Sequence, residues 1–178
     1  MTQTGNFVFK ALHVIAWVIF VGLSIEAGAL VVNFIFSLFK PEVLHNLYNK
    51  LDLSEMYNRS KWAFYGMYSF ILTIALLKAY LFYMLIKLLT KLDLSKPLTR
   101  LVSKQIMDIS YDTFSIGIIS YLARESAKNL LTRDFEISIL NDFWEDSQAF
   151  ILMAAVIYVI AIIFKKGIEI QEENDLTV

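Results

Sequence analysis

The stretch Leu72-Thr-Ile-Ala-Leu-Leu-Lys78-Ala-Tyr-Leu-Phe-Tyr-Met-Leu-Ile86 decides the fold, because it places one lysine in the middle of an otherwise uncharged and mostly apolar run. Such a run is typical of a helix that crosses a bilayer, for which about 20 residues suffice. A lone ammonium group at mid-depth costs roughly 2.5–3.5 kcal/mol on insertion scales. We therefore expect Lys78 to meet an acidic partner inside a bundle of helices.

The composition of the whole chain also favours a membrane protein. Of its 178 residues, 57% are hydrophobic, whereas soluble domains contain about 45–50% apolar residues. A net charge of −1 gives no electrostatic case for nucleic acid or for anionic lipid as the main ligand. The chain has no cysteine and only two prolines and six glycines, which predicts neither disulfides nor flexible linkers. We interpret residues 1–178 as a single membrane domain.

Apolar segments along the chain predict an all-α, integral membrane four-helix bundle. The expected spans cover about residues 11–39, 62–89, 103–123 and 148–164, and a polar tail follows over residues 167–178. Between the first two spans, residues 41–58 carry apolar side chains at helical spacing. This pattern predicts either an amphipathic helix on the membrane surface or a helix packed over the end of the bundle. Residues 135–139 alternate apolar and polar, which predicts a short strand or an extended hydrophobic edge.

An even number of spans places both chain ends on one side of the membrane. The basic residues on that side are denser and closer to the spans than those on the other side. By the positive-inside rule, we expect both termini in the cytoplasm.

Acidic residues in the other spans could neutralise the charge of Lys78 by forming an ion pair. Antiparallel neighbours place Glu26 within one helical turn of the depth of Lys78, and place Asp112 opposite it, with Asp108 one turn away. These four residues form a predicted intramembrane charged layer. One interpretation is a structural ion pair that fixes helix register. The other is a protonatable or ion-coordinating site, since the acids outnumber the cation.

Other chemistry finds no support in the sequence. His13 and His45 belong to opposite faces of the expected membrane, so they cannot share a metal or haem. The sequence contains no glycine-rich phosphate-binding loop. It also contains no serine, histidine and aspartate at one depth that could act together as nucleophile, base and acid. We therefore expect no cofactor, no metal and no catalytic residues, and interpret the protein as a non-enzyme.

The C-terminal stretch Phe164-Lys-Lys-Gly-Ile-Glu-Ile-Gln-Glu-Glu-Asn-Asp-Leu-Thr-Val178 resembles the closing signature of a bacterial family of small four-span membrane proteins, catalogued as a domain of unknown function. In that family a basic residue and a glycine lead into a glutamate-rich stretch and a terminal Asp-Leu-Thr with a branched aliphatic residue. The resemblance implies a multi-pass protein of the bacterial inner membrane, often encoded beside a small helix-turn-helix regulator. It implies no established activity and no catalytic residues.

Two functions follow as hypotheses. The first is a regulator or adaptor whose tail docks a cytoplasmic protein, such as that regulator, through a free carboxylate and neighbouring side chains. The alternative is a small transporter or proton-coupled protein that uses Glu26, Lys78 and Asp112. A tail that folds back on the bundle is also compatible with the sequence, and the oligomeric state stays open. The candidate docking residues are Glu169, Glu172, Glu173, Asp175, Leu176 and Val178.

Overall fold

A computed structural model describes residues 3–39, 52–92 and 97–175, with side chains described over 7–39, 52–92 and 97–174. Within these ranges the chain is helical and contains no strand. The predicted all-α fold is therefore confirmed. The long helices are α1 (Gln3–Phe39), α3 (Lys61–Lys91), α4 (Arg100–Leu131) and α5 (Ser147–Asp175), and the short ones are α2 (Ser54–Arg59) and the 3₁₀ helix η3 (Ser138–Phe143).

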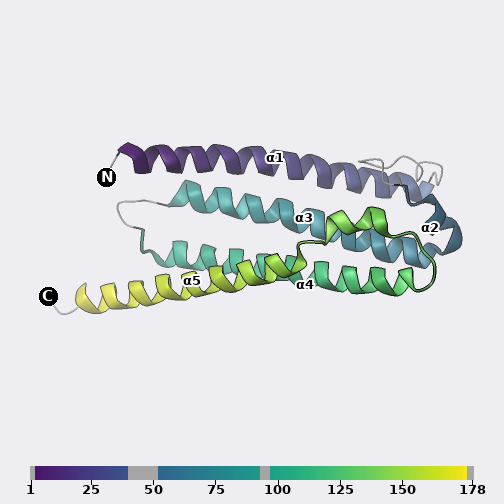
Figure 1. The fold of residues 1–178 in the computed structure, drawn as a ribbon. Coiled ribbons are helices and arrows are strands. Elements are labelled where there is room, and N and C mark those ends of the chain that lie inside the picture. Colours follow the sequence, from purple (N-terminus) through teal and green to yellow (C-terminus); the bar gives the residue numbers. More distant parts are fainter. Residues whose placement is uncertain (1–2, 40–51, 93–96, 176–178) are drawn as a thin grey trace.

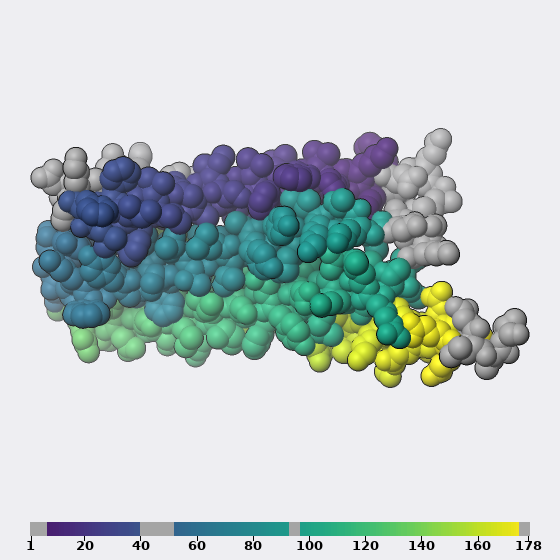
Figure 2. Space-filling view, turned by 180° about the vertical axis from the view of Figure 1, so that it is seen from behind, coloured from purple at the N-terminus to yellow at the C-terminus, as the bar shows by residue number. Residues whose placement is uncertain are grey.

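The long helices pack beside one another in the order of the sequence. The main contacts join α1 to α3, α3 to α4, and α4 to α5, and both chain ends lie at the same end of the molecule (Figure 1). Figure 2, seen from behind, shows α1, α3 and α4 as successive layers with the end of α5 emerging beside α4. The central position of α4 gives it protein neighbours on two sides.

Within the described residues, three stretches are long and apolar enough to cross a membrane: Phe7–Phe39, Lys61–Lys91 and Ser138–Asn174. The helix α4 does not meet this criterion, because acidic, basic and amide side chains interrupt it between Arg100 and Asp112. Contacts with α3 and α5 on either side reduce the surface that α4 offers to lipid. A polar helix can therefore occupy this position at a lower cost than an isolated one.

A seam of small residues joins α4 to α5. On α4, Ser103, Ser110 and Gly117 recur every seven residues and are buried. The Ser110 hydroxyl donates a hydrogen bond to the backbone oxygen of Ala154 at 2.9 Å. A Cβ atom added to Gly117 would lie 2.6 Å from Cγ1 of Ile151 and 3.2 Å from the backbone oxygen of Ser147. Small side chains thus let the two backbones approach closely over this whole seam.

Because Ser147 lies beside Gly117, α5 covers only the first half of α4. The second half is covered by the connection that follows α4, in which Leu140 and Trp144 are fully buried. These two side chains belong to one hydrophobic cluster with Phe64 and Tyr68 of α3. The connection that follows α4 therefore contributes to the core of the bundle.

The suggested strand over residues 135–139 is wrong. Phe135 and Ile137 are buried, as the alternation indicated, but residues 138–143 form the 3₁₀ helix η3. Within the described residues no second strand is present to pair with this segment, and its apolar side chains pack on helices instead. Arg59 holds the turn before it, donating hydrogen bonds of 2.6 Å to the backbone oxygens of Asp134 and Arg133.

Helix boundaries differ from the expected spans at several places. The third long helix runs to Leu131 rather than residue 123, and Thr99 caps its start by accepting a hydrogen bond from the Val102 amide. The last helix continues to Asp175, so most of the expected tail is helical. Of the expected amphipathic segment, residues 41–51 lie outside the described residues, and α2 occupies most of the remainder.

Candidate functional site

A pocket of about 390 Å³ opens between α3 and α4 and contains the two aspartates of the predicted charged layer. Asp108 and Asp112 lie one helical turn apart on α4, beside the face that packs on α5. Gln105 and Ser115 extend the polar lining along the same helix. From α3 the pocket is lined by Tyr80, Tyr83, Met84 and Lys87, and Tyr111 of α4 completes it.

The carboxylate of Asp112 lacks the partners that buried charges require. Its Oδ2 atom is fully buried, and no hydrogen-bond donor among the described residues reaches it. The Oε1 atom of Gln105, in the same pocket, is likewise buried without a donor. A buried carboxylate oxygen costs free energy unless it is paired. This oxygen of Asp112 is therefore left without a partner among the described residues.

Aromatic rings form the α3 side of this pocket. Tyr80 and Tyr83 are stacked with ring centroids 6.2 Å apart, and Phe20 of α1 lies 6.2 Å from Tyr83. The two tyrosines and Tyr111 are about half exposed. Their rings limit access to the aspartates without enclosing them.

Lys87 is the basic residue that lines the pocket. It is exposed, and no ion pair joins it to Asp108 or Asp112 within the described part of the chain. The sequence alone does not single out Lys87, because a lysine near the end of the expected span over residues 62–89 is an ordinary feature of a membrane-crossing helix. The spacing of Tyr80, Tyr83 and Lys87, at i, i+3 and i+7, places the three on one helix face and could have revealed them.

Lys78 does not pair with an acid among the described residues. Its side chain is half-buried, and its Nζ lies 5.7 Å from the ring centroid of Phe150 on α5. A ring face at this distance attracts a cation. The structure thus gives Lys78 an aromatic neighbour in place of the predicted carboxylate.

Glu26 lies near the depth of Lys78 but outside the α3–α4 pocket. Phe34 contacts Tyr68 and Phe20 contacts Tyr83, with ring centroids 5.2 and 6.2 Å apart. These contacts bracket Glu26 and align it with the middle of α3. Glu26 is half-buried, and no ion pair joins it to Lys78 in the described ranges. The structure therefore brings together Asp108 and Asp112, while Glu26 and Lys78 stay apart from them.

The candidate docking residues at the C-terminus are partly engaged with the chain itself. Arg100 donates two hydrogen bonds to Glu172, at 2.9 and 2.7 Å, and Lys166 donates one to Glu169 at 2.7 Å. Glu173 directly follows Glu172 within α5. The side chain of Asp175 and residues Leu176 and Val178 lie outside the described parts. The end of α5 is a helix tied to the start of α4.

The described residues contain no group of three or more histidine, aspartate or glutamate side chains that could hold a metal ion. Comparison with protein families gives one match, over residues 46–178, to a model described as "Protein of unknown function (DUF2975)". The chain belongs to the DUF2975 family. The match covers α2 through α5 of this DUF2975 protein and so includes Asp108 and Asp112. No curated protein and no solved structure matches the chain.

Proposed function

We propose that this DUF2975 protein is a multi-pass protein of the bacterial inner membrane and that all four long helices cross the bilayer, with both termini in the cytoplasm. Three helices are apolar enough to do so, and the antiparallel packing of α4 between α3 and α5 supports the fourth crossing. Orientation follows from the basic residues at the end that holds both termini. These include Lys87, Lys91, Arg100, Lys104, Lys165 and Lys166.

We propose further that the protein binds and exchanges a proton or a small cation at Asp108 and Asp112, as a transporter or a proton-coupled membrane protein. The observation that carries this proposal is the buried, unpartnered Oδ2 of Asp112 inside a pocket of about 390 Å³. Acidic side chains at membrane depth are costly to keep and commonly mark pathways for ions or protons. Neither role requires covalent chemistry, so the protein acts as a non-enzyme.

Ion flux through reconstituted protein tests this function. Liposomes that contain the protein and a trapped pH indicator are subjected to a gradient of protons, sodium or potassium. We expect at least one gradient to collapse faster with the parent protein than in empty liposomes, and Asp112→Asn to abolish the difference.

The matched control is Asp142→Asn, which removes an exposed acid of η3 far along the chain from the pocket. Its flux should equal that of the parent. Equal rates for the parent, Asp112→Asn and empty liposomes would contradict transport through this site, provided that the proteins melt at similar temperatures.

A second candidate function is docking of a cytoplasmic protein by the C-terminal helix. The specific observation is that α5 continues as a helix through Asp175, well past the last apolar run at Phe164. A helix that projects from the membrane presents side chains on several faces to a partner. The family resemblance suggests a small helix-turn-helix regulator as this partner.

Pull-down with purified regulator from a neighbouring gene, using the full chain and a chain truncated after Gly167, tests docking. Loss of the regulator on truncation supports it. Retention of the regulator by the truncated chain would exclude the C-terminal helix as the docking element.

A further inference from the structure

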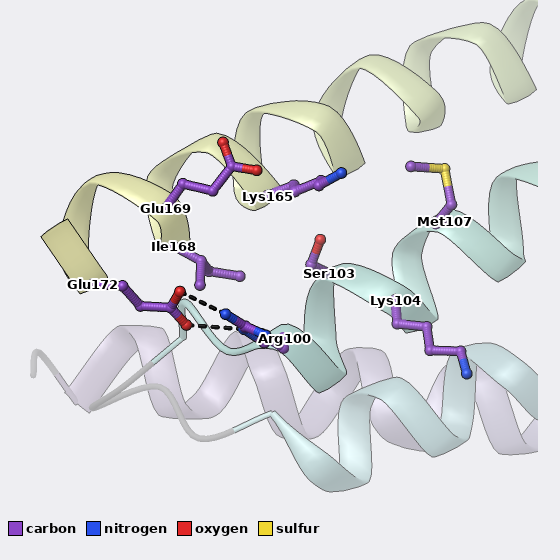
Figure 3. Close-up of a pocket in the computed structure, with 8 residues that line it drawn as sticks. All are labelled: Arg100, Ser103, Lys104, Met107, Lys165, Ile168, Glu169 and Glu172. Carbon is purple, nitrogen blue, oxygen red and sulfur yellow. Dashed lines mark hydrogen bonds and ion pairs between the residues drawn. The ribbon is translucent and has the colours of Figure 1, made fainter.

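A second pocket, of about 420 Å³, lies between the start of α4 and the end of α5. Three basic side chains line it, Arg100 and Lys104 from α4 and Lys165 from α5 (Figure 3). In this view the Lys165 side chain extends between the helices toward Met107, whereas the amine of Lys104 points away from Lys165. The net charge of the whole chain, −1, therefore conceals a local group of cations.

The acids at this pocket are already engaged with other cations. Glu172 accepts two hydrogen bonds from Arg100, which hold the pKa of that carboxyl below its usual value. Glu169 accepts a hydrogen bond from Lys166, which lowers its pKa in the same way. Both glutamates follow Phe164 and lie outside the apolar part of α5. Among the described residues, no carboxylate forms an ion pair with Lys104 or Lys165, although the charge of Lys165 also contributes to the lowered pKa of Glu169.

The pocket also has an apolar side that faces the membrane-spanning part of the protein. Met107 lies one turn after Ser103 on α4, and the buried Ile168 lies one turn after Phe164 on α5. Lys165 marks the position at which the apolar run of α5 ends. Cations beside apolar surface at this depth match a ligand with a charged head and a hydrocarbon chain.

We propose that this pocket binds the phosphate headgroup of an anionic phospholipid at Lys165, with the exposed side chain of Lys104 turning toward the bound phosphate and an acyl chain beside Met107. Basic pockets between helices at the cytoplasmic membrane surface are suited to anionic headgroups, because lysine and phosphate attract over short distances in a weakly screened setting. The inference is independent of ion exchange at Asp112, which lies in a different pocket.

Native mass spectrometry of the detergent-purified full chain tests the proposal. The protein is titrated with phosphatidylglycerol and, separately, with phosphatidylcholine. We expect a preference for phosphatidylglycerol that falls roughly 10-fold or more in the double variant Lys104→Gln/Lys165→Gln. The charge-retaining variant Lys104→Arg/Lys165→Arg should keep the preference, which separates loss of the site from loss of folding.

The matched control is Lys10→Gln/Lys91→Gln, which removes two exposed lysines, one near the start of α1 and one at the end of α3. It should bind phosphatidylglycerol like the parent. An equal loss in this control, or the absence of any preference in the parent, would overturn the proposal. Competition by millimolar inorganic phosphate would also overturn it, because the pocket would then take a soluble phosphate rather than a lipid.

Discussion

Replacement of Gly117 by alanine probes the seam between α4 and α5. The added methyl group would lie 2.6 Å from Cγ1 of Ile151 and 3.0 Å from the backbone nitrogen of the same residue. Rotation of the Ile151 side chain relieves only the first contact, so the helices must separate by a few tenths of an ångström. Overpacking of this kind costs about 1–3 kcal/mol. Because the contacts with backbone atoms at 3.0 and 3.2 Å cannot be relieved by a rotamer change, we expect the upper part of this range, about 2–3 kcal/mol. Alanine is favoured over glycine within a helix by roughly 0.5–1 kcal/mol, which leaves a net destabilisation of about 1–2.5 kcal/mol.

The assay is unfolding of the purified protein in mixed micelles by a denaturing detergent, followed by helix content. Gly66→Ala on α3 is the matched control, because a Cβ atom there meets nothing within 4 Å. It should leave the free energy of unfolding unchanged or raise it by up to about 1 kcal/mol. A Gly117→Ala protein as stable as the parent would refute the close approach of α4 and α5. An equal loss in Gly66→Ala would show that the effect comes from glycine itself.

Three further predictions address the other contacts. Lys78→Met should lower the free energy of unfolding by only about 0.5–2 kcal/mol, because it removes an aromatic contact and leaves no acid unpaired; a loss of about 3–5 kcal/mol, measured in the same assay, would indicate a buried ion pair. Tyr68→Phe should lower the free energy of unfolding by about 1 kcal/mol, because the Tyr68 hydroxyl donates a buried hydrogen bond of 2.9 Å to the Leu30 backbone oxygen. An unchanged free energy of unfolding would contradict this hydrogen bond. Single cysteines at Lys91 and Arg133, in a chain that has no other cysteine, should react with a membrane-impermeant reagent from opposite sides of the membrane, and labelling from one side would contradict four crossings.

Residue patterning was sufficient to predict the helical fold. Long apolar runs have few alternatives to helix, so α1 and α3 agree with the expected spans. Antiparallel helices joined by short connections leave little freedom in register, and in the structure residues of α3 line one pocket with Asp108 and Asp112. The seven-residue spacing of Ser103, Ser110 and Gly117 was visible in the sequence as well, although its meaning depends on the matching small residues of α5.

Side-chain pairing could not be derived from depth alone. Equal depth places Lys78, Glu26 and Asp112 in one layer. Which of these side chains meet depends on how each helix is rotated about its own axis, and the sequence does not specify that rotation. The order of packing, with α3 between α1 and α4, directs Glu26 and Asp112 to different sides of α3. Likewise, the burial of Trp144 depends on a connection that folds back onto α4, a tertiary feature with no local signature.

Infrared difference spectroscopy of the reconstituted protein tests the role of Asp112 most directly. The spectrum reports the carboxyl stretching bands that change when pH is shifted or when a cation is added. We predict a band that is present in the parent and in Asp142→Asn and absent in Asp112→Asn. Identical difference spectra for the parent and Asp112→Asn would show that Asp112 exchanges neither a proton nor a cation, and would contradict the proposed function.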